Sequence, residues 1–277
     1  MAKRTPLGHI ANAVNSCLGF VGLSISKLPE RNTLERLIKQ LFELHQVNCV
    51  IDVGAHHGEF GGILRSIGYR GKIHSFEPST DAFERLERAR RGDRLWDIHK
   101  LCLGDAEETA EINRFQGTDF NSLYTPSSYA MSGQFGSHLH RTGTETVQVK
   151  RLDSVVDELG IGIEKGRGYL KIDTQGHDMH VLRGASNTIG SVCAVQVEMS
   201  ALPLYDGVPA MEEALSLFRE LGLLPVGFQP VCRERDKLTV IEWDCILAPH
   251  DAAKRGLTGK PSIRSNFVPD HSEAASA

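Results

Sequence analysis

The sequence predicts a doubly wound α/β fold with a mostly parallel sheet, and three observations support this prediction. Apolar strand-like runs alternate with helical patterns along most of the chain, an order typical of βαβ units. The first of these runs, residues 49–53, leads directly into a glycine turn at 54–58. A second run ends in Phe76-Glu77-Pro78 about twenty residues later, as in one half of a nucleotide-binding sheet.

A helix is predicted before the first strand. Asn32 is a residue type that caps helices, and Glu35, three residues later, is at the position that completes a capping box. Apolar residues then recur at helical spacing: Leu34, Leu37, Ile38, Leu41 and Phe42. We expect this helix to lie against the sheet just before the first strand.

Strands and helices alternate from there. The predicted strands cover residues 49–53, 72–76, 96–103, 168–173 and 192–199, and the predicted helices cover residues 59–67, 79–92, 154–159, 179–183 and 210–221. Two closing strands, 223–228 and 238–248, have no helical pattern between them and are predicted to be antiparallel. The expected result is a seven-stranded, Rossmann-like sheet with one reversed strand and helices on both faces.

The helical rhythm is lost between residues 107 and 149. Residues 110–115 and 146–150 alternate like strands, and a polar segment rich in Gly, Ser and Thr, residues 116–144, lies between them. Because a loop of this length is usually a binding element or a cover, we expect a partly ordered lid over the active site. The predicted organisation is a lead-in and helix over 1–45, one domain over 46–250, and a polar, disordered tail over 251–277.

Composition limits the classes of function. A chain of 277 residues that is 40% hydrophobic can bury one large core, and its net charge of −4 gives no general attraction to nucleic acid or anionic membranes. The cysteines form no Cys-x-x-Cys pair, which favours free thiols in a reducing compartment. The amino terminus is too interrupted by polar residues for a membrane span, although an amphipathic surface anchor stays an alternative. We expect a cytoplasmic protein with a small-molecule or glycan partner, no nucleic-acid partner and no stable membrane insertion; the oligomeric state is not specified.

The glycine turn indicates the type of cofactor. A dinucleotide fingerprint has a second glycine two places after the first, where the pyrophosphate approaches the backbone, and this chain has His56 there. The turn of Gly54, Ala55 and Gly58 therefore suits a cofactor without pyrophosphate, such as S-adenosylmethionine. Its amino-acid part would lie near Asp52, and Glu77 would bind its ribose. An NAD(P)-dependent oxidoreductase and a non-catalytic nucleoside-binding module stay as alternatives.

Acidic residues follow several of the predicted strands. Asp52, Glu77, Asp173 and Glu198 would each lie at the carboxyl end of a strand, which is where ligands bind in open parallel sheets. We expect these four acids to converge on one crevice.

The chain resembles the FkbM family of S-adenosylmethionine-dependent methyltransferases over roughly residues 50–249. The motifs that carry the resemblance are the 52–58 turn, Phe76-Glu77-Pro78, Leu103-Gly104-Asp105, Asn121-Ser122-Leu123, Leu152-Asp153-Ser154, residues 171–176, 181–185 and 195–198, Pro203-Leu204-Tyr205 and residues 243–247. The resemblance implies a class I methyltransferase sheet and O-methylation of a hydroxyl on a sugar, glycan, polyketide or related metabolite. One departure is His177-Asp178, where the family usually has an aromatic or small residue followed by Glu.

The resemblance implies roles for individual residues in cofactor binding and catalysis. Leu103, Gly104 and Asp105 would border the adenine. Asp173 and Glu198 are the candidate catalytic residues, with His177 in reserve, because a hydroxyl nucleophile must lose its proton to a base. The two acids could act directly or could hold Mg²⁺, which suits oxygen ligands.

The remaining histidines lack cysteine partners and do not specify zinc. We expect them to be solvated or hydrogen-bonded.

Overall fold

A computed structural model describes residues 34–250 of the chain. The chain divides into two units, Met1–Gln46 and Val47–Ala277. The first unit contains helix α2, Leu34–His45, which forms where the helical spacing predicted it. The predictions for the lead-in, the Asn32 cap and the tail lie outside the described residues, and the packing of α2 on the sheet stays a prediction.

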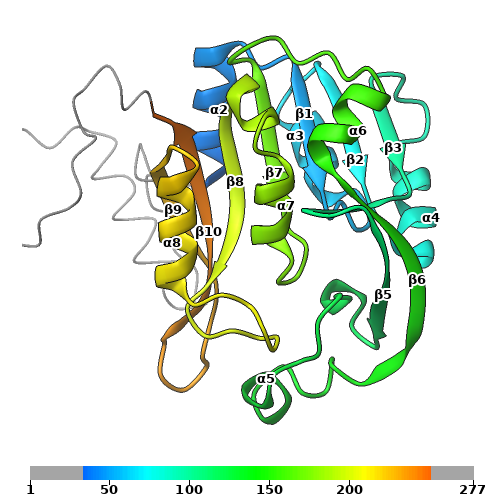
Figure 1. The fold of residues 1–277 in the computed structure, drawn as a ribbon, viewed down its shortest axis with the longest axis vertical. Helices are drawn as coiled ribbons and strands as arrows, with labels where there is room; N and C mark the ends of the chain where they lie inside the picture. The colour runs from blue at the N-terminus through cyan, green and yellow to red at the C-terminus, as the bar shows by residue number, and fades with distance from the viewer. Residues whose placement is uncertain (1–33, 251–277) are drawn as a thin grey trace, which may run out of the picture. The chain divides into compact units, whose positions relative to one another are not determined.

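The second unit is built on a seven-stranded sheet with the order β3-β2-β1-β7-β8-β10-β9 (Figure 1). Its strands are β1 (Cys49–Val53), β2 (Lys72–Phe76), β3 (Trp96–His99), β7 (Gly168–Ile172), β8 (Val192–Ser200), β9 (Leu223–Arg233) and β10 (Val240–Pro249). Strand β10 runs antiparallel to β8 and β9, and all other pairings are parallel. The predicted fold class, including the antiparallel closing pair, is confirmed.

Helices cover both faces of this sheet (Figure 1). They are α3 (Glu59–Ser66), α4 (Thr80–Ala89), α6 (Leu152–Glu158), α7 (Asp178–Gly184) and α8 (Met211–Glu220), and a short 3-10 helix, η3 (Thr188–Ser191), precedes β8. Apolar residues of α6, α7 and α8 form one core with β1, β7 and β8. Every residue of β1 and β7 is buried, which explains why these strands are almost continuously apolar in sequence.

The predicted third strand is wrong in its extent. Residues 96–103 form two strands, β3 and β4 (Cys102–Gly104), separated by a turn in which Leu101 N–H donates to the His99 carbonyl at 3.0 Å. Strand β3 is the edge of the large sheet, so the chain can leave the sheet there. Strand β4 then joins a three-stranded sheet of order β4-β6-β5 with β5 (Glu108–Phe115) and β6 (Arg141–Arg151).

The polar segment 116–144 packs into a small hydrophobic cluster that is separate from the main core. It contains the 3-10 helix η2 (Thr118–Phe120), helix α5 (Ser128–Ser132) and the start of β6. Ala130 and Leu139 of this segment pack with Leu204, Tyr205 and Ile241. The segment is therefore joined to the loop after β8, and we call residues 116–140 the cover.

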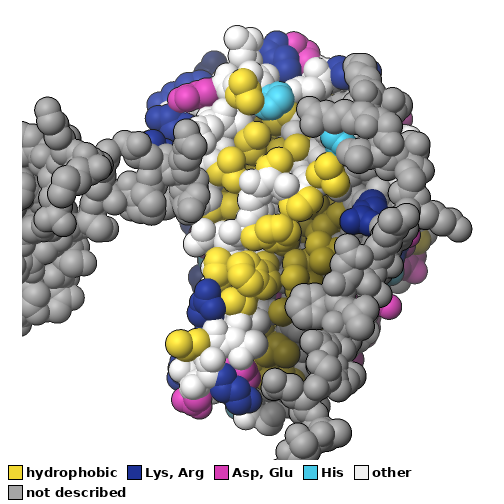
Figure 2. Space-filling view, turned by 90° about the vertical axis from the view of Figure 1, so that its left-hand side faces the viewer, with side chains coloured by type: hydrophobic (Ala, Val, Ile, Leu, Met, Phe, Trp, Pro, Cys, Tyr) yellow, Lys and Arg dark blue, Asp and Glu magenta, His cyan; other side chains and the backbone are white. Residues whose placement is uncertain are grey.

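Strand β9 is the other edge of the large sheet and presents apolar side chains outward. Leu224, Val226, Phe228 and Val231 are 38%, 46%, 44% and 47% exposed. Figure 2, which looks onto this side of the molecule, shows hydrophobic side chains gathered on the described part of this surface. Among residues 34–250, the helices are all too short or too polar to cross a bilayer.

Candidate active site

A row of buried polar residues crosses the sheet below the carboxyl ends of its central strands. Ser75, Asp52, Lys171 and Gln196 are neighbours in register on β2, β1, β7 and β8. Ser75 Oγ donates to Asp52 Oδ2 at 2.9 Å, and Lys171 Nζ lies 3.6 Å from Asp52 Oδ1. Asp52 is completely buried. It therefore contacts protein atoms and is not exposed to solvent.

The glycine turn brings two strand ends together. Gly54 has a φ of +75°, and a Cβ atom there would lie 1.8 Å from the Asp173 carbonyl oxygen. The N–H groups of Gly54 and Ala55 both donate to the Phe76 carbonyl at 3.0 Å. Gly58 has a φ of +89° and faces side chains of α4 and β3. Packing within the protein thus requires both glycines, in addition to any role in cofactor binding.

Glu77 lies at the carboxyl end of β2, as predicted, and is 6% exposed. Its two carboxylate oxygens accept hydrogen bonds from the N–H groups of His56 at 2.9 Å and Ser79 at 2.8 Å. Burial raises the pKa of Glu77 to about 7, although these two hydrogen bonds act in the opposite direction. The carboxylate is fixed in orientation and keeps lone pairs for a ligand.

Asp173 follows β7 and is held by two donors. Lys171 Nζ lies 3.2 Å from Oδ2, and Gln175 Nε2 donates to Oδ1 at 3.2 Å. The Asp173 side chain is 34% exposed, so it is accessible to solvent, and Lys171 compensates its charge. Lys171 itself is 8% exposed.

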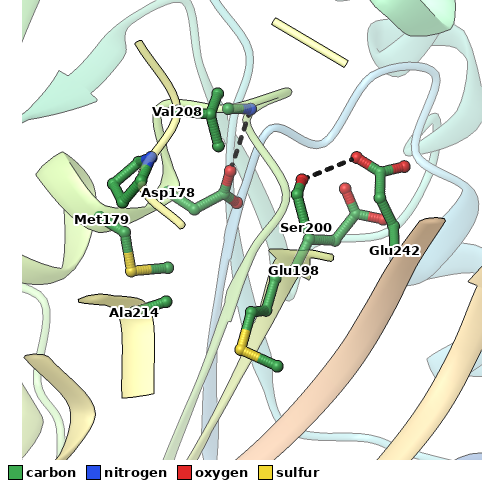
Figure 3. Close-up of a pocket in the computed structure, with 10 residues that line it drawn as sticks. Asp178, Met179, Glu198, Ser200, Val208, Ala214 and Glu242 are labelled. Carbon is green, nitrogen blue, oxygen red and sulfur yellow. Dashed lines mark hydrogen bonds between the residues drawn. The ribbon is translucent and has the colours of Figure 1, made fainter. Parts of the chain in front are cut away.

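Glu198 lies in β8 and lines a small pocket with Asp178, Ser200 and Glu242, as Figure 3 shows. The pocket volume of about 20 Å³ holds about one water molecule. Ser200 Oγ donates to Glu242 at 3.3 Å, and Asp178 accepts from the N–H groups of Thr174 and Gly176, each at 3.1 Å. Within residues 34–250, the Glu198 carboxylate accepts no hydrogen bond.

Burial raises the pKa values of the carboxyl groups around this pocket. Together with the charges of Asp173 and Glu242, it raises the pKa of Glu198 well above its ordinary value. The pKa of Glu242 rises to about 7, and that of Asp178 to about 6, with burial as the main cause in both. Glu242 and Asp178 can therefore exchange protons near neutral pH.

His177 lies apart from this pocket, against the predicted adenine border. Its Nε2 atom is 2.8 Å from the position of a Cβ atom on Gly104, and its Nδ1 atom is 3.3 Å from the Tyr124 hydroxyl. Burial lowers its pKa to about 4, so the ring is neutral at pH 7. Of the other two border residues, Leu103 is buried in the core, and Asp105 is paired with His180 at 3.0 Å.

The cover contacts both the glycine turn and the loop after β7. Thr118 Oγ1 lies 3.1 Å from His56 Nε2, and Ser122 Oγ donates to the Gln175 carbonyl at 2.6 Å. At its other end, Ser127 N–H donates to the Leu204 carbonyl at 2.8 Å.

Sequence reasoning missed three residues of this site: Lys171, Gln175 and Glu242. A charged residue inside an otherwise apolar strand was the available signal for Lys171. Glu242 shares its strand with a second acid, Asp244, so the pattern alone does not single it out. Gln175 has a φ of +52°, which its residue type does not indicate.

Comparison with known proteins places the chain in a family. Residues 52–224 match the methyltransferase FkbM domain, so the chain belongs to the FkbM methyltransferase family. The resemblance seen in its motifs is thereby confirmed. The oxidoreductase alternative is not supported.

Individual proteins that resemble the chain share a low sequence identity with it. Hexuronic acid methyltransferase AglP of Haloferax volcanii is 28% identical over 167 residues, which are 58% of this chain and 59% of that protein. The chain thus spans less than two thirds of the length of this curated relative. Among solved structures, the N-terminal domain of human METTL16 in complex with SAH has 11% identity and a TM-score of 0.42, covering 89% of this chain and 84% of that one. Precorrin-6y C5,15-methyltransferase from Geobacter metallireducens has 8% identity and a TM-score of 0.42, covering 82% and 93%.

Proposed function

We propose that the protein transfers a methyl group from S-adenosylmethionine to a hydroxyl of a sugar or glycan. The observation that carries this proposal is the Glu198 carboxylate, which faces the pocket without a hydrogen-bond partner among the described residues. An acceptor hydroxyl needs a nearby base to take its proton. Family membership supports methyl transfer, and the similarity to a hexuronic acid methyltransferase supports a sugar acceptor.

The residues at the carboxyl ends of β1 and β2 fit the cofactor. S-adenosylmethionine supplies, when bound, a methyl group on a sulfonium that a nucleophile can displace in line. Glu77 is the residue that would hold the ribose diol, because each of its oxygens accepts one backbone N–H and has a second lone pair. The turn of Gly54, Ala55 and Gly58 would hold the amino-acid part, above the buried Asp52. Gly104 and Asp105 would border the adenine.

Asp173 and Glu198 differ in their surroundings, and this difference suggests different roles. Lys171 and Gln175 hold Asp173 as an oriented carboxylate. Glu198 has no such partners and carries a raised pKa, as expected of a group that gains and loses a proton during turnover. In the proposed reaction, the acceptor oxygen would bond to the methyl carbon as the carbon–sulfur bond of the sulfonium breaks, and S-adenosylhomocysteine would leave. The proton of the acceptor would pass to Glu198, and Asp173 would orient the reacting groups. His177 is assigned to the adenine side and not to proton transfer.

Mg²⁺ bound by Asp173 and Glu198 is a second route to the same reaction. Lys171 already compensates the charge of Asp173, and we therefore favour direct proton transfer. We therefore expect turnover to persist in excess EDTA, and loss of activity that added Mg²⁺ restores would favour the metal route instead.

Ligand binding is the first test of the proposal. S-adenosylhomocysteine should raise the melting temperature of the protein, because a ligand that binds only the folded state stabilises it. NAD serves as the comparison ligand. Stabilisation by NAD alone would overturn the assignment of the cofactor.

Methyl transfer is the second test. The protein is incubated with labelled S-adenosylmethionine and a panel of neutral and uronic-acid sugars and glycans. On the acceptor that is labelled, Glu198→Gln should lower kcat by about 10²- to 10⁴-fold, the usual contribution of a general base. Glu212→Gln, an exposed position on α8, is the matched control and should leave kcat unchanged. An unaltered rate in Glu198→Gln would exclude Glu198 as the base.

A further inference from the structure

Three side chains at the start of α3 come together in a way that the mechanism above does not use. The rings of His56 and His57 are stacked with their centroids 3.5 Å apart. Glu59, the first residue of α3, places its Oε1 atom 3.4 Å from the Nδ1 atoms of both histidines. One ligand atom from each of the three residues lies within 4.8 Å of the other two, the only such group among residues 34–250.

The two distances between a histidine Nδ1 atom and Glu59 Oε1 match the spacing of ligands around one metal ion. Two ligands that are each about 2.05 Å from a tetrahedral Zn²⁺ lie about 3.3 to 3.4 Å apart. Neither histidine Nδ1 atom forms a hydrogen bond with Glu59 Oε1 within the described chain, although the separation would allow one. The three atoms thus lie close together without forming hydrogen bonds to one another.

The backbone and the cover support this arrangement. His56 has a φ of +47°, a conformation that residues other than glycine adopt rarely and that is concentrated at functional sites. The other ring nitrogen of His56, Nε2, lies 3.1 Å from Thr118 Oγ1 and 3.4 Å from Asp119 Oδ1. A metal on Nδ1 puts the ring proton on Nε2, where these two oxygens can accept it. A histidine between a metal and a carboxylate is the common outer arrangement of metal sites.

We propose that His56, His57 and Glu59 bind a divalent transition metal ion of the Zn²⁺ type, with Asp119 as an outer partner of His56. Two imidazoles and one carboxylate select such an ion over Mg²⁺ or Ca²⁺, which prefer oxygen ligands. The Glu59 side chain is 59% exposed, which leaves solvent access for a water as the fourth ligand.

The ion would join the cofactor turn to the cover. His56 donates its backbone N–H to Glu77 at 2.9 Å, and its ring contacts Thr118 of the cover. A metal on His56 would therefore fix both the turn beside the ribose-binding carboxylate and the start of the cover. The proposal does not depend on the proposed reaction, because none of its three ligands is assigned to proton transfer.

The test is Zn²⁺ binding to the tag-free, full-length protein, measured by calorimetry and by competition with a chromogenic chelator. His57→Asn and Glu59→Gln should each weaken the Zn²⁺ affinity at least tenfold. His56→Asn should do the same without disturbing the backbone, because Asn tolerates a positive φ. Asp119→Asn should weaken binding by about 10- to 100-fold without removing a ligand, as outer partners do.

Controls separate this site from the other histidines and thiols of the chain. His140→Asn, at an exposed position in the cover, should leave the affinity unchanged. Co²⁺ should give the visible absorption of a tetrahedral site in the wild type and lose it in His56→Asn. Equal Zn²⁺ affinity in the wild type and in a His56→Asn/His57→Asn double variant, with both proteins folded by circular dichroism, would overturn the proposal.

Discussion

Lys171 Nζ lies 3.2 Å from Asp173 Oδ2, and this pair joins a partly exposed acid to the buried polar row of the sheet. The same ammonium group lies 3.6 Å from Oδ1 of Asp52, the completely buried acid of the glycine turn. Burial lowers the pKa of Lys171, but the charges of Asp173 and Asp52 outweigh burial and raise it above its ordinary value. Lys171 is therefore charged at neutral pH and compensates two carboxylates.

Replacing Lys171 should destabilise the fold. In Lys171→Met, Asp52 loses the one cation that lies beside it among the described residues while it stays buried, and breaking a buried pair in this way costs about 3 to 5 kcal/mol. The free energy of unfolding, measured by urea denaturation, should fall by this amount. Lys237→Met is the control, because the Lys237 side chain is 74% exposed and its ion pair contributes little. A loss below about 1 kcal/mol in Lys171→Met would show that Asp52 does not depend on this cation.

Gly54 should tolerate no side chain. A Cβ atom would lie 1.8 Å from the Asp173 carbonyl, and the φ of +75° adds strain to any other residue. Gly54→Ala should therefore lower the free energy of unfolding by more than about 2 kcal/mol, since the left-handed conformation alone costs 1 to 2. Gly62→Ala is the matched control, because nothing lies within 4 Å of its added Cβ. In the interior of α3 this change should stabilise by about 0.5 to 1 kcal/mol. Comparable stability of the two variants in thermal and urea unfolding would contradict the packing argument.

The fold could be predicted largely from local pattern. Strands such as β1 and β7 are completely buried, so their sequences are almost continuously apolar, interrupted only by Asp52 and Lys171. The division of residues 96–103 into two strands could not be predicted in this way. It depends on the pairing of Cys102 with Val149, far along the chain, and local propensity contains no information about that partner.

The acids of the candidate site could be predicted because they follow strands in the sequence. The hydrogen-bond and ion-pair partners that distinguish their roles could not. Asp173 and Glu198 have the same charge in the sequence, yet Lys171 and Gln175 bind the first and leave the second unpaired. Glu242 enters the site because β10 runs antiparallel beside β8, where it is paired with Ser200. Such contacts arise from register across strands and not from spacing along the chain.

Glu77 should make stability depend on pH. Its pKa in the folded protein is about 7, above the ordinary value of 4.5. Between these two pH values, the folded state holds a proton that the unfolded state has released, so the unfolding free energy falls as pH rises. The difference of about 2.5 pKa units corresponds to a loss on the order of 3 kcal/mol from Glu77 between pH 4.5 and 7.

This contribution can be isolated with Glu77→Gln. The variant does not titrate at this position, so the difference in unfolding free energy between the wild type and the variant should change by that amount between pH 4.5 and pH 8. The other buried carboxyl groups are present in both proteins and cancel in this difference. A difference that stays constant with pH would mean that the Glu77 pKa is not raised by folding.

Tyr205 should couple the cover to Asp173, the acid proposed to orient the reacting groups. Its hydroxyl lies 2.9 Å from the Phe120 carbonyl of the cover and 3.0 Å from Gln175 Oε1, and Gln175 in turn donates to Asp173. In Tyr205→Phe, the amide of Gln175 loses the contact that orients it, so Asp173 is held by Lys171 alone. We expect kcat for methyl transfer to fall about tenfold, together with a stability loss of about 1 to 2 kcal/mol from the unpaired buried groups.

Tyr129→Phe provides the matched comparison. The Tyr129 hydroxyl also anchors the cover, through Glu234 at 3.3 Å, but it has no contact with Gln175 among the described residues. Steady-state kinetics should therefore give a normal kcat for Tyr129→Phe and a reduced kcat for Tyr205→Phe. If both variants lose kcat equally, Tyr205 acts only by fastening the cover, and the proposed link from its hydroxyl through Gln175 to Asp173 is wrong.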